Sequence, residues 1–148
     1  EKIDRKKQIL QAAIEIITSE GYAALGMRSL ARASGLKLGA LQYHFANWEV
    51  LLEALVDYVG STYWSAWESQ IDKHEDVSLL EALQFVADDP PAGELHSEDL
   101  WPQLWAMGRV EPLVQELVDD IYARYLRIFD IYMGPVSEAT LLGVTSYL

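Results

Sequence analysis

Hydrophobic residues recur every three or four positions along most of the chain, which is the period of an α-helix. The first stripe predicts an amphipathic helix from about residue 4 to residue 20, ended by Gly21. Its apolar positions are Ile9, Leu10, Ala13, Ile14 and Ile17. Two short helices follow, near 27–33 and 38–45, with Gly35 in the turn between them. Because no run alternates with period two for long enough to predict a strand, the expected fold class is all-α.

The next elements are predicted from their caps as well as from their stripes. Asn47 has the side chain of an N-cap and precedes a long apolar stripe that reaches Trp67, with Gly60 able to loosen the helix midway. Ser78 and Glu81 have capping-box spacing, which predicts another helix before the loop that begins near residue 88.

The C-terminal third is also predicted to be helical. Ser97 can cap a helix that ends near residue 107, with Pro102 in its early turns or kinking it. Pro112 fits the first turn of a long helix to about residue 133, whose apolar residues cover more than one face. Such a helix needs two packing partners. The segment 138–148 stops in mid-pattern, which is expected if the sequence is truncated or lacks pieces.

Composition narrows the class of protein. Apolar residues make up 51% of the 148 positions and charged residues only 23%, so apolar surface is expected beyond one core, at a subunit interface or a ligand cavity. A stretch of about 18 consecutive apolar residues and a signal-peptide pattern are both absent from the sequence, which favours a cytoplasmic protein without a membrane partner. The chain has no cysteine, which excludes disulfides, thiolate metal sites and a cysteine nucleophile.

The net charge of −12 is unevenly distributed. Residues 1–50 carry seven Lys and Arg against five acids, whereas residues 51–148 carry four against eighteen. Opposite charge in the two regions predicts two separate tasks. Since phosphate binding needs a basic surface, a nucleic-acid partner would be confined to the N-terminal third.

Two short helices joined by a turn that contains Gly form the helix-turn-helix pattern. The segment from Gly26 to Phe45 (GMRSLARASGLKLGALQYHF) resembles the TetR family of bacterial transcriptional regulators, and the likeness extends over about residues 9–52. The resemblance implies a DNA-binding domain over 1–47 and a helical ligand-binding and dimerisation domain over 48–148. It further implies a regulator, most simply a repressor, that binds a palindromic operator in double-stranded DNA as a homodimer and is released by a small-molecule effector.

Side-chain chemistry divides the expected DNA contacts into base-reading and positioning groups. The amide of Gln42 can pair with adenine, and Arg28 can reach guanine or merely a phosphate. The resemblance implies phosphate contacts from Lys37, Tyr43 and His44, which would fix register without reading sequence. The expected DNA-binding residues are Arg28, Ser29, Lys37, Leu38, Gly39, Ala40, Gln42, Tyr43 and His44.

The segment departs from the family pattern at four positions. Gly26 and Lys37 stand where the resemblance predicts small hydroxyl residues, so two helix caps are weaker or differently made. Gln42 replaces the more usual Tyr, which leaves the recognised base open. Trp48 replaces a common Lys, which removes one phosphate contact or places the ring against the first helix. Ala40, in the slim start of the second short helix, can contact a thymine methyl group.

Aromatic residues gather in the second region, where acids outnumber bases. At helical spacing they are either core or the lining of a pocket, and both interpretations stay open. A pocket would lie between the long helix from Trp48 and the helices of 78–107, and would suit a hydrophobic or cationic molecule. The candidate ligand-binding residues are Tyr63, Trp64, Trp67, Phe85, Trp101 and Trp105.

The helix that is apolar on two sides is predicted to pack, together with segment 138–148, against its two-fold mate in a four-helix interface. The candidate interface residues are Leu113, Leu117, Ile121, Tyr125, Ile128, Leu141, Leu142 and Thr145.

Other classes of protein are disfavoured by their missing motifs. The sequence has no Gly-rich phosphate loop, no Gly-x-Ser-x-Gly elbow and no His-Glu-x-x-His pair, so an enzyme is not expected. His74 and His96 have no second ligand at metal-binding spacing, so neither a metal nor a cofactor is expected. A helical dimeric adaptor or ligand-binding protein with weak or lost DNA binding remains the alternative, because of Trp48 and the acidic charge.

Overall fold

The computed structural model describes residues 4–71, 78–88, 95 and 97–133, and over these residues the chain is helical without strands. The predicted all-α fold class is therefore confirmed. The elements are α1 (Arg5–Glu20), the 3₁₀ helix η1 (Tyr22–Ala24), α2 (Met27–Ala33), α3 (Leu38–His44), α4 (Trp48–Ile71), α5 (Leu79–Asp88), α7 (Ser97–Gly108) and α8 (Pro112–Met133). The loop predicted after residue 88 and the predicted segment 138–148 lie outside the described residues.

The predicted helix ends are made by the side chains that the sequence offers. The carboxylate of Asp4 accepts a hydrogen bond from the backbone of Lys7 at 3.2 Å and begins α1. The side chain of Asn47 accepts one from the backbone of Val50 at 2.9 Å and begins α4. The predicted capping box is present, since Ser78 and Glu81 each accept a hydrogen bond from the other's backbone, at 3.2 and 2.8 Å.

A Schellman motif forms the turn between α2 and α3. The backbone N–H of Gly35 donates to the carbonyl of Arg32 at 3.1 Å, and that of Leu36 donates to the carbonyl of Ala31 at 2.8 Å. Gly35 has a φ of 67°, the left-handed conformation that side chains disfavour. The turn therefore ends α2 abruptly and fixes the direction in which α3 leaves it.

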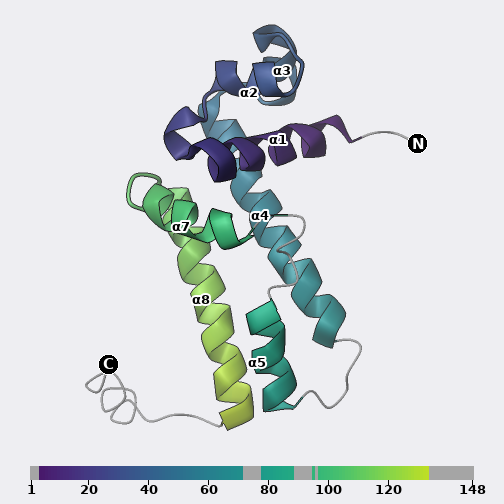
Figure 1. Cartoon of the computed structure of the whole chain (residues 1–148), viewed down its shortest axis with the longest axis vertical. Helices are drawn as coiled ribbons and strands as arrows, with labels where there is room; N and C mark the ends of the chain where they lie inside the picture. Colours follow the sequence, from purple (N-terminus) through teal and green to yellow (C-terminus); the bar gives the residue numbers. More distant parts are fainter. Residues whose placement is uncertain (1–3, 72–77, 89–94, 96, 134–148) are drawn as a thin grey trace.

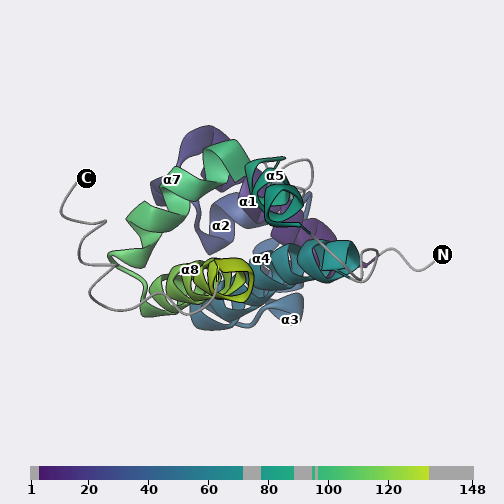
Figure 2. The ribbon, with the colours of Figure 1, turned by 90° about the horizontal axis from the view of Figure 1, so that it is seen from below.

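The helices form an elongated molecule with α2 and α3 at one end (Figure 1). Beneath them α1 crosses the upper part of α4, which continues through Gly60 without a break down to Ile71. Helix α8 runs beside α4, and α7 and α5 lie on one side of these two long helices (Figure 2). The molecule therefore has a small helix-turn-helix end and a larger helical body.

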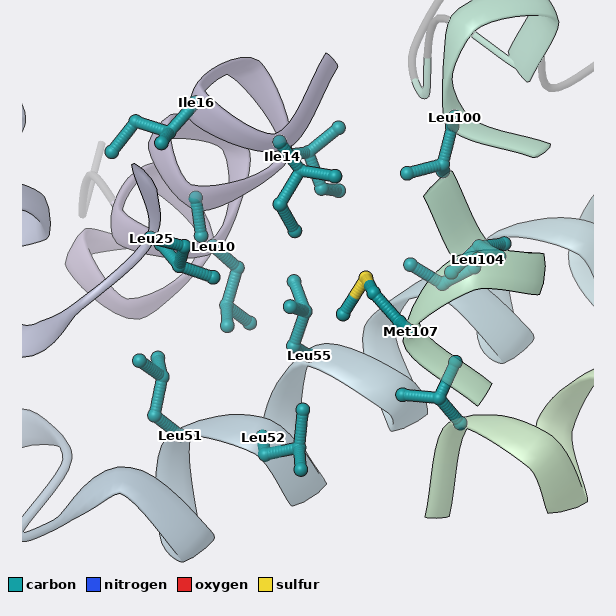
Figure 3. Packing of buried hydrophobic residues seen from close by; sticks show 14 of the residues in the cluster. Leu10, Ile14, Ile16, Leu25, Leu51, Leu52, Leu55, Leu100, Leu104 and Met107 are labelled. Carbon is teal, nitrogen blue, oxygen red and sulfur yellow. The ribbon is translucent and has the colours of Figure 1, made fainter. Parts of the chain in front are cut away.

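One continuous hydrophobic core joins the two parts. Ile14 of α1, Leu55 of α4 and Met107 of α7 point toward one another from three elements (Figure 3). A small apolar cavity among them has a volume of about 10 Å³, which is room for a single water at most. The residues of 1–47 and 48–133 that the structure describes as buried therefore pack together, and the helix-turn-helix end has a fixed place on the body.

We predict that Gly35→Ala lowers the free energy of unfolding by about 1–2 kcal/mol, because a side chain disfavours the left-handed conformation by that amount. Urea denaturation followed by helical circular dichroism measures the loss. The matched control is Gly39→Ala within α3, where an added Cβ meets nothing within 4 Å and Ala favours the helix. Equal stability of the two variants would contradict the role of Gly35.

Candidate nucleic-acid interface

Helix α3 presents a polar face at the end of the molecule. Leu41 is fully buried against the core and orients the helix, so the residues on its other side face solvent. Gln42 is exposed, and the ring of Tyr43 is 87% exposed, a large fraction for an aromatic side chain. Lys37, Gly39 and Ala40 at the start of α3 are also exposed. The structure thus brings most of the predicted DNA-binding residues onto one open surface.

The flanking predicted residues are less open. Arg28 on α2 is exposed, whereas Leu38 and His44 are half-buried. The ring of His44 lies edge-on to that of Tyr43, with 5.3 Å between the centroids. The two neighbouring rings at the end of α3 therefore contact each other, with Tyr43 the more exposed of the two.

Ser29 caps α2 in place of the hydroxyl that Gly26 lacks. Its hydroxyl accepts a hydrogen bond from the Gly26 backbone at 2.9 Å and lies 2.8 Å from the carbonyl of Ala24, to which it donates. The side chain is half-buried, so its first task is structural. The cap of α2 is therefore made differently, as the sequence predicted: the hydroxyl comes from Ser29, three residues after Gly26.

Trp48 packs inward rather than toward solvent. Its ring lies 6.3 Å from that of Tyr22, between centroids, and it is packed against the core. The sequence left open whether Trp48 contacts the first helix; its described ring partner is in η1, directly after α1.

Tyr22 fastens the helix-turn-helix end to the body. Its backbone N–H donates to the side-chain carbonyl of Gln103 on α7 at 3.2 Å, and its hydroxyl donates to the carboxylate of Glu111 between α7 and α8. Burial, and then the neighbouring Glu111 carboxylate, raise the pKa of Tyr22 to about 12. The phenol therefore remains a hydrogen-bond donor throughout the neutral pH range. Motifs and periodicity do not predict this contact, because the two partners are 89 residues apart in the chain.

The predicted ligand-binding residues do not converge on one described cavity. Tyr63 is buried and lies 5.5 Å from the ring of Trp101, which in turn lies 6.4 Å from that of Tyr122. The row of rings therefore runs from the buried Tyr63 on α4, through the half-buried Trp101 on α7, to the exposed Tyr122 on α8. Trp105 is exposed on α7. Trp64 faces a different groove, and the side chains of Trp67 and Phe85 lie outside the described residues.

The groove beside Trp64 runs between α4 and α8 and has a volume of about 620 Å³. Its walls carry carboxylates from both helices, and Val56, Leu113 and Leu117 give it an apolar floor. The four acidic residues are Glu53, Asp57, Glu116 and Asp120. At its edge the guanidinium of Arg124 lies 3.6 Å from the centre of the Trp64 ring. The charged group of Arg124 thus lies over the face of the Trp64 ring, beside the acidic residues of the groove.

The predicted dimer-interface residues fall into three groups. Leu117 and Ile121 are buried in the chain's own core, so they are not available to a second subunit; the apolar face that the sequence assigned to a partner is covered by α4 and α7. Leu113 is partly exposed, at the α4–α8 groove. The side chains of Tyr125 and Ile128 and the residues Leu141, Leu142 and Thr145 lie outside the described residues. Tyr122 and Leu126, one turn apart on α8, are exposed and were not among the predicted residues.

The described ranges contain neither a metal-binding cluster nor a membrane-spanning helix. No group of three or more His, Asp or Glu there could hold a metal ion. No helix in the same ranges is both long and apolar enough to span a bilayer.

Comparison with known proteins supports the regulator interpretation. The family model described as bacterial regulatory proteins, tetR family, matches residues 9–55, which confirms the resemblance predicted from the sequence. The nucleoid occlusion factor SlmA of Marinobacter nauticus is 30% identical over 79 residues, covering 53% of this chain. The match spans only 40% of the length of that relative.

Solved structures share the fold over most of the chain. A protein from Saccharomonospora viridis, described as a transcriptional regulator in complex with choline, has a TM-score of 0.66 at 21% identity. The superposed part covers 86% of this chain and 67% of that protein's chain. A TetR-family transcriptional regulator from Rhodococcus sp. has a TM-score of 0.66 at 22% identity, over 92% of this chain and 76% of its own. At these identities the likeness is one of fold alone.

Proposed function

Since residues 9–55 belong to the TetR family of bacterial regulatory proteins, we propose that this chain is a cytoplasmic transcriptional repressor that reads operator DNA with α3. The observation that carries the proposal is the exposed polar face of α3, where Gln42 and Tyr43 face solvent while Leu41 anchors the helix. Residues 1–50 carry seven Lys and Arg, whereas residues 51–148 carry only four. Because phosphates bind to basic surface, this distribution favours DNA binding at the end that holds α2 and α3. A chain with this task needs no catalytic site.

The contacts follow from the chemistry of the exposed side chains. Gln42 can pair with adenine and Arg28 with guanine in the major groove, while Lys37 and Tyr43 hold phosphates on either side. Gly39 and Ala40 leave the start of α3 slim, which lets its backbone approach the bases. Ser29 acts from behind this surface by capping α2, and the half-buried Leu38 lies at the start of α3 beside Gly39 and Ala40.

We predict that Gln42→Ala costs about 1–3 kcal/mol of binding at one base-pair position and relaxes the preference there, whereas Lys37→Ala weakens all duplexes alike. Duplexes selected from a random pool by the wild-type protein, titrated at fixed salt concentration, measure both effects. If the two variants lose the same affinity for every duplex, Gln42 does not read a base.

The repressor is further proposed to act as a homodimer through α8. This is supported by Tyr122 and Leu126, which are 45% and 61% exposed on one face of the helix. Apolar side chains exposed together on a helix favour association. A two-fold dimer would place two copies of α3 on the half-sites of a palindrome.

We predict that Leu126→Asp produces monomers, because a carboxylate would be buried without a partner in the interface. Sedimentation velocity measures the change. The matched control is Leu80→Asp on α5, where the side chain is 73% exposed on another element, and this variant should remain dimeric. A dimeric Leu126→Asp protein would place the interface elsewhere.

The effector is proposed to be an organic cation that binds in the α4–α8 groove. Of the four carboxylates, Asp120 is already paired with Arg124 at 3.5 Å, and the other three supply the charge complementarity. The apolar floor suits a hydrocarbon body. The Arg124 guanidinium on Trp64 is the chain's own example of a cation in this environment. The similarity in fold to a protein solved with choline is consistent with this class of ligand. Binding releases DNA to the extent that the ligand prefers the DNA-free conformation.

We predict that choline binds to the groove and that its neutral isostere dimethylbutanol does not. Asp57→Asn and Glu116→Gln should each weaken choline binding roughly fivefold, the factor for about 1 kcal/mol between nearby charges in water. Calorimetric titration measures the affinities, with Glu98→Gln on α7 as an acidic control outside the groove. Unchanged choline affinity in both groove variants would exclude this site.

A further inference from the structure

Tyr22 gathers several polar and aromatic contacts between the helix-turn-helix end and the body at one residue, and its bond to Glu111 is one of them. Tyr22 donates through its hydroxyl to Glu111 and through its backbone N–H to Gln103, and its ring packs on Trp48. Three separate elements of the body, the α7–α8 corner, α7 and the start of α4, therefore hold one residue of η1.

The backbone of Glu111 is hydrogen-bonded to both of its neighbouring helices. Its backbone N–H donates to the carbonyl of Met107 at 2.8 Å, at the end of α7. Its own carbonyl accepts from the backbone N–H groups of Val114 and Gln115, at 3.1 and 3.2 Å, at the start of α8. The carboxylate that holds Tyr22 is thus carried by the residue at which α7 ends and α8 begins.

On its other side Tyr22 is linked to the first turn of α2. The backbone N–H of Leu25 donates to the carbonyl of Tyr22 at 3.0 Å, so η1 is a closed turn. The carbonyl of Ala24 in that turn accepts from the hydroxyl of Ser29, which caps α2. Hydrogen bonds and one tight turn therefore connect the start of α8 to the start of α2.

We propose that Tyr22 and Glu111 are positioning residues that set the orientation of α2 and α3 on the body, and with it the spacing of the two recognition helices in the dimer. The inference rests on the proposed function. A hydrogen bond to a carboxylate is both strong and directional, so it resists rotation of η1 about α1 in a way that apolar packing does not. Any displacement of α8 at the α4–α8 groove would reach α2 by this route as well as along α4.

The test compares Tyr22→Phe, which keeps the ring on Trp48, with Glu111→Ala, which removes the acceptor, and with the double variant. The matched control is Tyr58→Phe, since the hydroxyl of Tyr58 accepts a hydrogen bond from Gln11 of α1 at 3.4 Å and so joins α1 to α4. Binding is measured to a palindromic duplex selected by the wild-type protein, to the same duplex with its half-sites moved by one base pair, and to an isolated half-site.

Each single variant should lose about tenfold in its discrimination between the two spacings, the lower range expected for a hydrogen bond to a charged group. Affinity for the half-site should stay at the wild-type value, and the double variant should resemble the singles because they break one contact. Tyr58→Phe should keep the wild-type discrimination. If Tyr22→Phe keeps it too, or if half-site affinity falls in parallel, the positioning role is overturned.

Hydrogen exchange of the free protein separates this inference from the proposed function. Both single variants should exchange the amide hydrogens of Leu25 and Leu30 about tenfold faster than wild type, because these amides close η1 and the first turn of α2. If the wild-type protein binds no duplex, the proposed function fails, while faster exchange in the variants still supports the positioning role of Tyr22 and Glu111. If both variants exchange at wild-type rates, that positioning role is overturned whatever the DNA result.

Discussion

The apolar contact between α1 and the body determines where the rest of the helix-turn-helix end lies. Ile14 and Ile17 of α1 face a space enclosed by α4, α7 and α8, and almost no volume is left between them. Helices α2 and α3 have seven residues each, far too few to be stable alone, so they depend on α1 for their own packing. Loss of the contact between α1 and the body would thus destabilise α1, α2 and α3 together, because their packing depends on that contact.

Features encoded by neighbouring residues could be predicted from the sequence. The α1 stripe, the caps at Asn47 and Ser78 and the first turn at Pro112 depend on side chains within a few positions of one another. The turn at Gly35 is likewise local, because glycine alone adopts its backbone conformation without strain. These signals sufficed for the all-α fold and for the exposed face of α3.

Features that depend on distant partners could not be predicted in the same way. Tyr22 is an ordinary aromatic residue in the sequence, and only the fold brings Glu111 to its hydroxyl. Tyr63 and Trp64 are adjacent, yet about 100° of rotation per residue turns one into the core and the other into the α4–α8 groove. Periodicity showed that α8 needs two partners, but it did not show that Leu117 and Ile121 meet partners in the same chain.

The separation of charge along the molecule has a consequence for how it would meet a polyanion. The basic first fifty residues include the end with α2 and α3, and the acidic remainder includes the long helices that lead away from it. In the field of a duplex this arrangement is an electric dipole, and it experiences a torque that turns α3 toward the phosphates while the body is pushed outward. Encounters would therefore be oriented before any base is touched. Added salt would slow capture by weakening this alignment as well as by screening attraction.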